Sequence, residues 1–153
     1  MAGLSADHIN PFLISATKIF KDMCMVDVKI GKPSIKQADF TNDTIIIMIG
    51  ITGEIKGQVL ISFRDDTACD IASRMMMSKI VFMDEISMSA ISELGNMILG
   101  NAATIFSTKG IGIDITPPSI CKGNVSFSNT FSQNISVPLL YEDKMFEIDI
   151  AIM

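Results

Sequence analysis

Residues 44–51, with the sequence TIIIMIGI, form an uncharged run dominated by isoleucine. Branching at Cβ favours the extended conformation of a β-strand. Apolar side chains at consecutive positions, rather than at alternate ones, are typical of a strand that is covered on both faces. The run is also far shorter than the roughly 20 apolar residues of a membrane-spanning helix. We therefore expect residues 44–51 to be a central strand, with other elements packed on both faces of its sheet.

The composition fits one folded domain over residues 1–153. Of the 153 residues, 48% are hydrophobic and 19% are charged, which excludes a disordered chain and allows a sizeable core. The net charge of −5 argues against binding to nucleic-acid phosphates. The first residues, MAGLSADHINPF, lack a basic stretch followed by an apolar one, so no signal peptide is expected. We expect a cytoplasmic protein without a membrane-inserted segment.

Cysteine and histidine are too scarce for several kinds of site. Cys24, Cys69 and Cys121 lie far apart and form no CxxC pair, so we expect reduced thiols rather than a disulfide scaffold or a zinc site. His8 is the single histidine, which argues against a histidine-based metal site or a catalytic triad. Neither a GxxxxGK[ST] loop nor a GxGxxG fingerprint is present. We therefore expect no metal site in the chain itself.

Helical and strand periodicities alternate along the chain and indicate an α+β fold. Helical spacing of apolar residues predicts helices at residues 10–24, 65–76 and 84–107. Alternating or β-branched segments predict strands at residues 26–30, 44–51, 55–63, 111–115, 124–127, 132–141 and 146–152. The last of these strands is expected to bury one face. We expect a mainly antiparallel sheet packed against the long third helix, with the second helix beside it.

Cap and turn residues give sharper local expectations. Asn10 and Pro11 fit the N-cap and the first position of the first helix. Residues 65–67 (Asp-Asp-Thr) supply cap candidates for the second helix. The methionines at residues 75–77 are expected to fill gaps in the core, with adaptable packing at an interface as the second interpretation. Pro138 argues for an edge position or a bulge in its strand.

The predicted helix at residues 84–107 has two distinct faces. At about 100° per residue, an apolar stripe points one way and forms the expected core contact; it consists of Ile91, Leu94, Ile98, Ala102 and Ile105. Polar or small residues lie on the opposite face, within about 60° of one another; they are Ser89, Glu93, Asn96 and Gly100. Spacing alone fits an ordinary solvated face as well as a functional site, because every amphipathic helix has a polar side.

The glycines in this helix favour a functional interpretation. Gly95 and Gly100 each cost up to about 1 kcal/mol relative to alanine inside a helix. Asn96 is also a poor helix former. Because Gly100 shares the polar stripe with Asn96, the backbone or a loop of a partner could approach the helix closely there. The polar face is therefore a candidate binding or catalytic surface.

The order Ser89-x-x-x-Glu93-x-x-Asn96-x-x-x-Gly100 resembles the signature of the CheC/CheX/FliY phosphatase family, whose members act on phosphorylated CheY-type response regulators. Further segments resemble the CheX branch in the same order; they are Gly31-Lys32-Pro33, Gly53-x-x-x-Gly57 with residues 59–63, and residues 115–119 with Gly123. The motif occurs once, as in CheX, whereas CheC-type members carry it twice. The length leaves no room for the additional segments of FliY.

The resemblance implies a CheX-like α+β fold and a hydrolase that removes the aspartyl phosphate of a CheY-type regulator in two-component signalling, as in chemotaxis. Asn96 would orient a water in line with the bond to be broken. Glu93 would pair with the active-site lysine of the regulator, and Ser89 and Gly100 would contact the partner beside them. The regulator would supply Mg²⁺, so the chain needs no cofactor of its own.

The resemblance also implies a homodimer formed through the sheets, and the apolar surplus of the sequence is compatible with such an interface. A second interpretation stays open, in which the chain is a non-catalytic CheX-like module that only binds a response regulator or another signalling protein. The presence of both Glu93 and Asn96 favours the enzyme.

Overall fold

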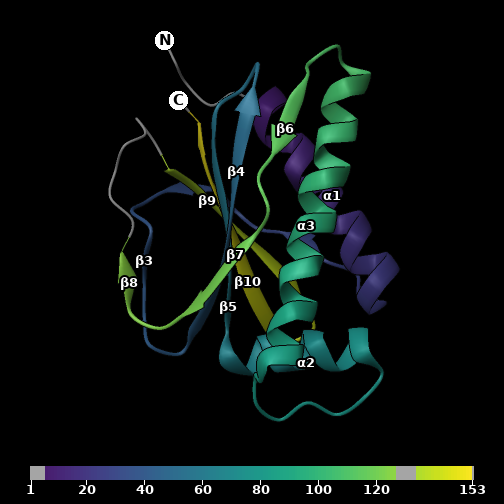
Figure 1. Cartoon of the computed structure of the whole chain (residues 1–153), viewed down its shortest axis with the longest axis vertical. Coiled ribbons are helices and arrows are strands. Elements are labelled where there is room, and N and C mark those ends of the chain that lie inside the picture. Colours follow the sequence, from purple (N-terminus) through teal and green to yellow (C-terminus); the bar gives the residue numbers. More distant parts are fainter. Residues whose placement is uncertain (1–5, 127–133, 153) are drawn as a thin grey trace.

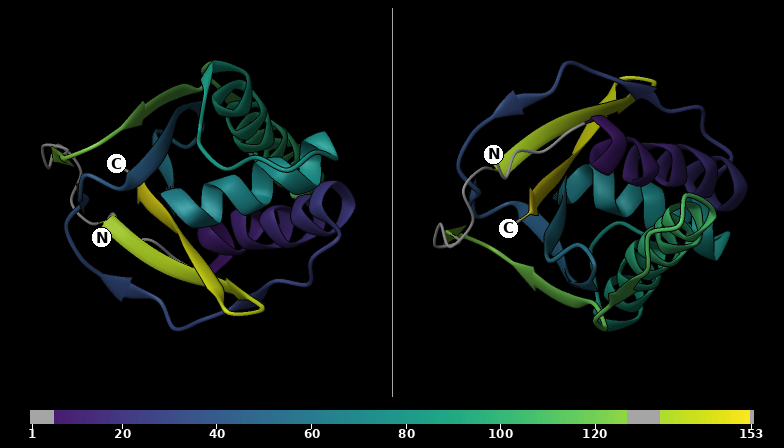
Figure 2. Two further views of the ribbon diagram at one scale, coloured as in Figure 1. Left: turned by 90° about the horizontal axis from the view of Figure 1, so that it is seen from below. Right: turned by 90° about the horizontal axis from the view of Figure 1, so that it is seen from above.

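Residues 6–126 and 134–152 are described in the computed structural model, and they adopt the expected α+β architecture (Figure 1). The helices of this part are α1 (Ala6–Cys24), α2 (Asp65–Met76) and α3 (Glu85–Thr108). The strands are β1 (Lys29–Ile30), β2 (Ser34–Ile35), β3 (Asp39–Phe40), β4 (Thr44–Gly53), β5 (Gly57–Arg64), β6 (Ile113–Ile115), β7 (Ser119–Lys122), β8 (Val125–Ser126), β9 (Asn134–Tyr141) and β10 (Lys144–Ile152). The helices lie together on one side of a curled sheet (Figure 2).

The main sheet is antiparallel at each pairing of the described strands. Its order is β1-β9-β10-β5-β4-β6, with β2 also paired to β9 and β7 also paired to β4. The hairpins β4–β5 and β9–β10 form its centre, joined by the long β5–β10 pairing. A separate pair, β3–β8, lies apart from them. The predicted antiparallel sheet and the predicted hairpin of residues 44–51 with 55–63 are therefore confirmed.

β4 is the central strand that its isoleucine run predicts. It lies between β5 on one side and β6 and β7 on the other. Ile45, Ile47 and Ile49 are at most 1% exposed and join the core beneath the helices. Ile46 packs in a smaller apolar cluster with Leu60, on the face away from the helices. Both faces of β4 are therefore buried, as the sequence predicts.

Contacts with α1 fix the position of α3. Phe12 of α1 meets Phe106 of α3 edge to face, with ring centroids 5.3 Å apart. The fully buried Ser15 of α1 donates a hydrogen bond to the backbone carbonyl of Ile98 in α3. α2 also packs against α3, as predicted (Figure 2). No helix in the described residues is both long enough and apolar enough to cross a membrane.

The first helix begins earlier than its cap residues indicate. In the described residues α1 starts at Ala6, so Asn10 and Pro11 lie within the helix rather than at its N-cap and first position. Pro11 is past the first turn of α1, so it removes one intrahelical hydrogen bond. Pro11 is buried and Ile9 packs against the core, so apolar burial extends the helix on the N-terminal side of the predicted start.

The ends of α2 also differ from expectation. Its N-cap is Arg64, which makes no side-chain cap hydrogen bond, and the aspartates at residues 65–66 lie in the first turn, where they favour the helix dipole. Met77 follows the helix in the left-handed conformation, with φ of 53°, and is 93% exposed. The interpretation of residues 75–77 as core is therefore wrong for Met77, whereas Met75 packs against the core.

Pro138 lies in β9, which is the second strand of the sheet rather than the predicted edge strand, because β1 and β2 pair with its outer side. The carbonyl of Pro138 accepts a hydrogen bond from the backbone N–H of Gly31 at 2.7 Å. N–H and C=O of a strand residue point to the same side, so the missing N–H faces the outer side of β9. β1 and β2 pair with β9 on either side of this position, so no ladder hydrogen bond is lost there.

Short strands account for the other differences. Of the predicted strand at residues 26–30, only β1 pairs, and β2, β3 and β7 form in segments that were expected to be loops. Strands of two to four residues are too short to show an alternating pattern in the sequence. In β10, Asp149 is only 1% exposed, so this strand buries part of its second face as well. The predicted strand positions 127, 132 and 133 lie outside the described residues.

Candidate active site

A side-chain cap fixes the start of α3. The Asp84 carboxylate accepts hydrogen bonds from the backbone N–H of Ser87 at 2.8 Å and from its hydroxyl at 2.7 Å. These bonds lower the pKa of Asp84, which keeps the carboxylate charged at the positive end of the helix dipole. Because the cap fixes where α3 begins, helical geometry then determines the direction of each later side chain.

The apolar side of α3 faces the core. Ile91, Leu94, Ile98 and Ala102 are at most 1% exposed, as predicted. Ile105 is only half-buried, and the remaining core positions are taken by Leu99 and Phe106. The buried sector turns toward α1 because Phe12 of that helix packs on Phe106, so the prediction for Ile105 is wrong.

The two glycines of α3 serve different purposes. A Cβ at Gly95 would lie 3.0 Å from Cγ2 of Ile47, so the small residue lets the helix pack closely on β4. A Cβ at Gly100 would have no neighbour within 4 Å among the described residues. Packing therefore explains Gly95 but leaves Gly100 as an open stretch of backbone on the surface.

The predicted polar face is accessible. Ser89 and Glu93 are exposed, while Asn96 and Gly100 are half-buried. Glu93 and Asn96 follow one another by about one helical turn, roughly 4.5 Å along the axis. Neither side chain has a hydrogen bond or ion pair within residues 6–126 and 134–152. The structure therefore brings together a free carboxylate and a free carboxamide on the solvent side of α3, as the spacing predicts.

The cysteines and the possible metal ligands in the described residues are poor candidates for a catalytic site. All three cysteines are free, and burial raises the pKa of Cys24 to about 11 and also raises the pKa values of Cys69 and Cys121. A thiol with a raised pKa is a poor nucleophile. Within the ranges that the structure describes, no three histidine, cysteine or acidic residues gather to hold a metal ion. The polar face of α3 is the chemically distinctive surface.

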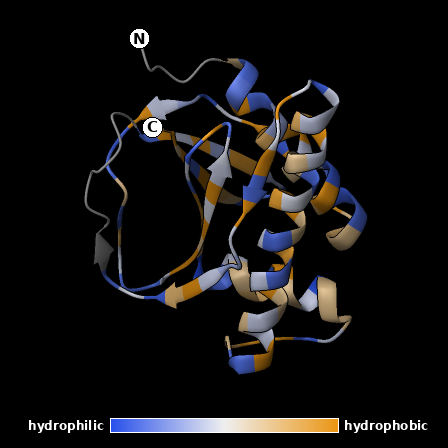
Figure 3. Ribbon diagram, turned by 45° about the horizontal axis from the view of Figure 1, so that its top comes forward, coloured by the Kyte–Doolittle hydropathy of each residue, from blue (hydrophilic) through white to orange (hydrophobic). Residues whose placement is uncertain are grey.

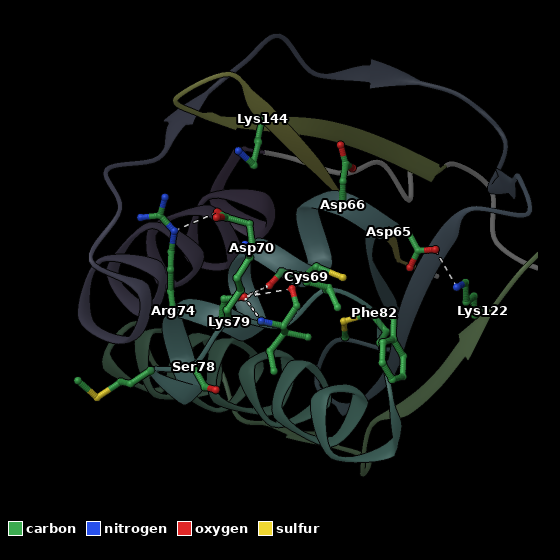
Figure 4. A pocket seen from close by; sticks show the side chains of 15 residues that line it. Asp65, Asp66, Cys69, Asp70, Arg74, Ser78, Lys79, Phe82, Lys122 and Lys144 are labelled. Carbon is green, nitrogen blue, oxygen red and sulfur yellow. Dashed lines mark hydrogen bonds and ion pairs between the residues drawn. The ribbon is translucent and has the colours of Figure 1, made fainter.

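A groove of about 1030 Å³ lies elsewhere, between α2 and the α2–α3 connection (Figure 4). Four of its charged side chains form two ion pairs with each other. The Arg74 guanidinium contacts the Asp70 carboxylate at 3.0 Å, and Lys122 contacts Asp65 at 2.8 Å. None of the four motif residues of α3 lines this groove. The groove therefore lies apart from the residues that the sequence analysis singles out.

Comparisons with known proteins agree with this picture. The family model for the chemotaxis phosphatase CheX matches residues 45–148. The CheY-P phosphatase CheX of Thermotoga maritima is 30% identical over 151 residues, which are 97% of each chain. A crystal structure of a CheC-like superfamily protein from Shewanella sp. PV-4 superposes with a TM-score of 0.88, at 29% identity over 98% of this chain and 99% of that one.

A solved complex also resembles this chain. The structure of the CheX-CheY-BeF3-Mg²⁺ complex from Borrelia burgdorferi superposes with a TM-score of 0.81. The identity is 32%, over 97% of this chain and 99% of that one. Sequence and structure thus agree along nearly the whole length, and the chain belongs to the chemotaxis phosphatase CheX family.

Proposed function

We propose that this protein is a phosphatase that hydrolyses the aspartyl phosphate of a CheY-type response regulator in two-component signalling. The observation that carries the proposal is the pair Glu93 and Asn96 on the open face of α3 in a member of the CheX family, where neither side chain has a partner among the described residues. The relative from Thermotoga maritima is a CheY-P phosphatase, and the complex from Borrelia burgdorferi contains CheY.

Asn96 acts on the attacking water. An aspartyl phosphate is a reactive acyl phosphate, so its hydrolysis mainly needs a water held in line with the bond that breaks. The Asn96 carboxamide oxygen accepts a hydrogen bond from that water and orients it. The water oxygen forms the new bond to phosphorus, the aspartate oxygen leaves with the electron pair of the old bond, and inorganic phosphate departs. No nucleophile on α3 is required.

Glu93 aligns the two proteins. Its free carboxylate pairs with the active-site lysine of the regulator, which docks α3 over the phosphate and loosens the hold of the lysine on it. Mg²⁺ belongs to the regulator and offsets the charge of the phosphoryl group. Ser89 and Gly100 lie on the same face and contact the rim of the regulator, where the bare backbone at Gly100 allows close approach.

The decisive experiment compares the lifetime of a phosphorylated CheY-type regulator with and without this protein, in excess Mg²⁺, by loss of phosphoryl label. We expect the label to disappear faster when the protein is present. Unchanged lifetimes with every CheY-type regulator of the same organism contradict the phosphatase. Binding without any change in lifetime would instead identify a non-catalytic module.

A further inference from the structure

Exposed apolar side chains gather where α2 connects to α3. Val81, Phe82 and Ile86 are 72%, 69% and 68% exposed. The first two lie in the connection, and Ile86 is in the first turn of α3. Figure 3 shows hydrophobic colouring in this region, which lies next to the start of the long helix. Single exposed apolar residues are ordinary, but a cluster of them marks an interaction surface. We call these three residues the α2–α3 apolar patch.

The patch continues the polar face of α3. Glu93 follows Ile86 by seven positions, and seven positions turn a helix by about 700°, so the two side chains differ in direction by only about 20°. They lie about 10 Å apart along the axis. A partner surface that covers Glu93 and extends toward the start of α3 therefore also covers Ile86.

The polar face needs such an anchor. Ser89, Glu93 and Asn96 are small or polar, and a carboxylate must give up its hydration when it pairs. Protein interfaces take most of their affinity from a few apolar or aromatic side chains at well-packed positions, with polar contacts around them. Phe82 and Ile86 are such side chains. Phe82 lies at one end of the groove, near the ion pair of Asp65 and Lys122, where it is open to a partner (Figure 4).

We propose that the α2–α3 apolar patch is the docking anchor for the response regulator. The regulator would present an apolar rim about 10 Å from its active-site lysine, matching the distance between Ile86 and Glu93 along the helix. This proposal rests on the phosphatase function proposed above. It assigns most of the affinity to the patch, while Asn96 supplies the chemistry and Glu93 contributes to both.

The test uses the double variant Phe82→Ser, Ile86→Gln in the full chain. With a phosphorylated CheY-type regulator as substrate, we expect KM to rise about tenfold, equivalent to about 1.4 kcal/mol, and the loss to fall on KM rather than on kcat. The matched control is Ile14→Gln, because Ile14 is an isoleucine on α1 that is 53% exposed. The control should keep the KM of the parent protein, and thermal unfolding of both variants confirms that they are folded.

The outcomes separate this proposal from the phosphatase function. If the parent protein dephosphorylates the regulator and the double variant has the same KM, the patch is not the anchor. If the parent protein is inactive, the proposal is tested by measuring its binding to the regulator in the presence of BeF3⁻ and Mg²⁺. Binding that the double variant loses supports the anchor, and no binding by the parent protein overturns it. A change of the double variant from dimer to monomer in sedimentation would assign the patch to a second copy of the chain and overturn the proposal.

Discussion

Two half-buried asparagines on α3 differ in their hydrogen bonding. The amide of Asn101 donates a hydrogen bond to Oγ of Ser15 at 3.1 Å and so ties α3 to α1. Asn96 has no partner within the described residues and points to the solvent side. An asparagine in a helix costs stability relative to alanine unless its side chain makes a compensating contact. Asn101 makes one within the protein, and Asn96 is free to make one with a water and a partner.

Replacing Asn96 with alanine should remove most of the activity. We expect Asn96→Ala to lower kcat by about 100-fold, since it removes the group that orients the water. Binding of the regulator should change little. The free energy of unfolding should stay within about 0.5 kcal/mol of the parent protein or rise slightly, because alanine is the better helix former. Single-turnover loss of phosphoryl label and urea unfolding measure the two effects.

The control for this experiment is Asn101→Ala, which removes the same amide from the opposite side of the helix. It should cost stability, because it leaves the hydroxyl of Ser15 with one contact fewer, and it should keep the catalytic rate. Full activity in Asn96→Ala would contradict the proposed role of Asn96.

Glu93 should contribute to both binding and rate. In Glu93→Gln the side chain keeps its length but loses the charge that pairs with the regulator lysine. We expect the dissociation constant for the regulator to rise and kcat to fall, whereas Asn96→Ala affects kcat alone. The dissociation constant is measured with the BeF3⁻ form of the regulator, and its salt dependence should weaken in Glu93→Gln. A variant with unchanged affinity and unchanged salt dependence would rule out the ion pair.

At the scale of the element, α3 packs closely on the sheet with one side and leaves the other open. Gly95 allows this packing, because Ile47 of β4 occupies the space that a side chain would need. Gly100 has open space around it among the described residues. Since both glycines cost helix stability, we expect the one that packing does not require to lie on the surface that a partner approaches.

Replacing each of the two glycines with alanine should have different effects on the free energy of unfolding. Gly100→Ala should raise the free energy of unfolding by up to about 1 kcal/mol, through helix propensity alone, while weakening regulator binding. In Gly95→Ala the same gain is opposed by overpacking against Ile47, which costs about 1–3 kcal/mol. We expect Gly95→Ala to be neutral or destabilising. Urea unfolding of both variants checks the signs, and a destabilised Gly100→Ala would contradict the view of Gly100 as an open position.

How far the sequence predicts α3 depends on how local each property is. The direction of Glu93 and Asn96 follows from helical geometry and the Asp84 cap, so spacing alone predicts it. The role of Gly95 depends on Ile47 in another strand, and no local pattern shows that contact. The half-buried Ile105 likewise reflects the packing of α1 on α3. Tertiary contacts therefore determine the features of α3 that helical periodicity alone does not predict.

The same limit applies to the sheet. The hairpin of β4 and β5 is predictable, since its strands are long and joined by a turn. β7 pairs with β4 over residues 119–122, directly after the two prolines at residues 117–118, and shows no periodicity of its own. Pairing with β4 therefore stabilises β7 as a strand. The sequence thus predicts the long elements that build the framework and misses the short ones that complete its edges.

At the scale of the whole molecule, the face of the sheet away from the helices contains a buried acid. Asp149 of β10 is 1% exposed, and its Oδ2 accepts a hydrogen bond from the Asn134 amide at 2.9 Å. Its Oδ1 has no partner among the described residues. Burial raises the pKa of the Asp149 carboxyl, and Glu147 adds to the rise while Lys36 opposes it. The folded state therefore favours the protonated form.

This shift makes stability depend on pH with a definite sign. Because the folded pKa of Asp149 is above the unfolded value of about 3.9, the contribution of Asp149 to stability is most favourable below that value and is lost as pH rises through the folded pKa. Asp149→Asn should remove this dependence and raise the free energy of unfolding at pH 7, with little effect below about pH 4. The exposed Asp114→Asn is the control, and urea unfolding over this pH range is the measurement. A less stable Asp149→Asn at pH 7 would contradict the prediction.

The chain should form a homodimer through its sheet, as one domain per subunit with an active helix on each. Leu140 and Met145 lie opposite each other in the β9–β10 pair and are 41% and 44% exposed. The neighbouring Phe146 points to the core, and side chains alternate along a strand, so this apolar pair lies on the face away from the helices. An association there leaves α3 of both subunits open to the regulator.

Light scattering at micromolar concentration should give the mass of a dimer, and the double variant Leu140→Glu, Met145→Glu should give the mass of a monomer, because two like charges meet across the interface. The control is Met25→Glu, at a position that is 76% exposed just after α1. Since α3 is complete within one chain, the monomeric variant should still dephosphorylate the regulator. A monomeric parent protein would contradict the dimer, and a dimer that survives both charges would place its interface on another surface.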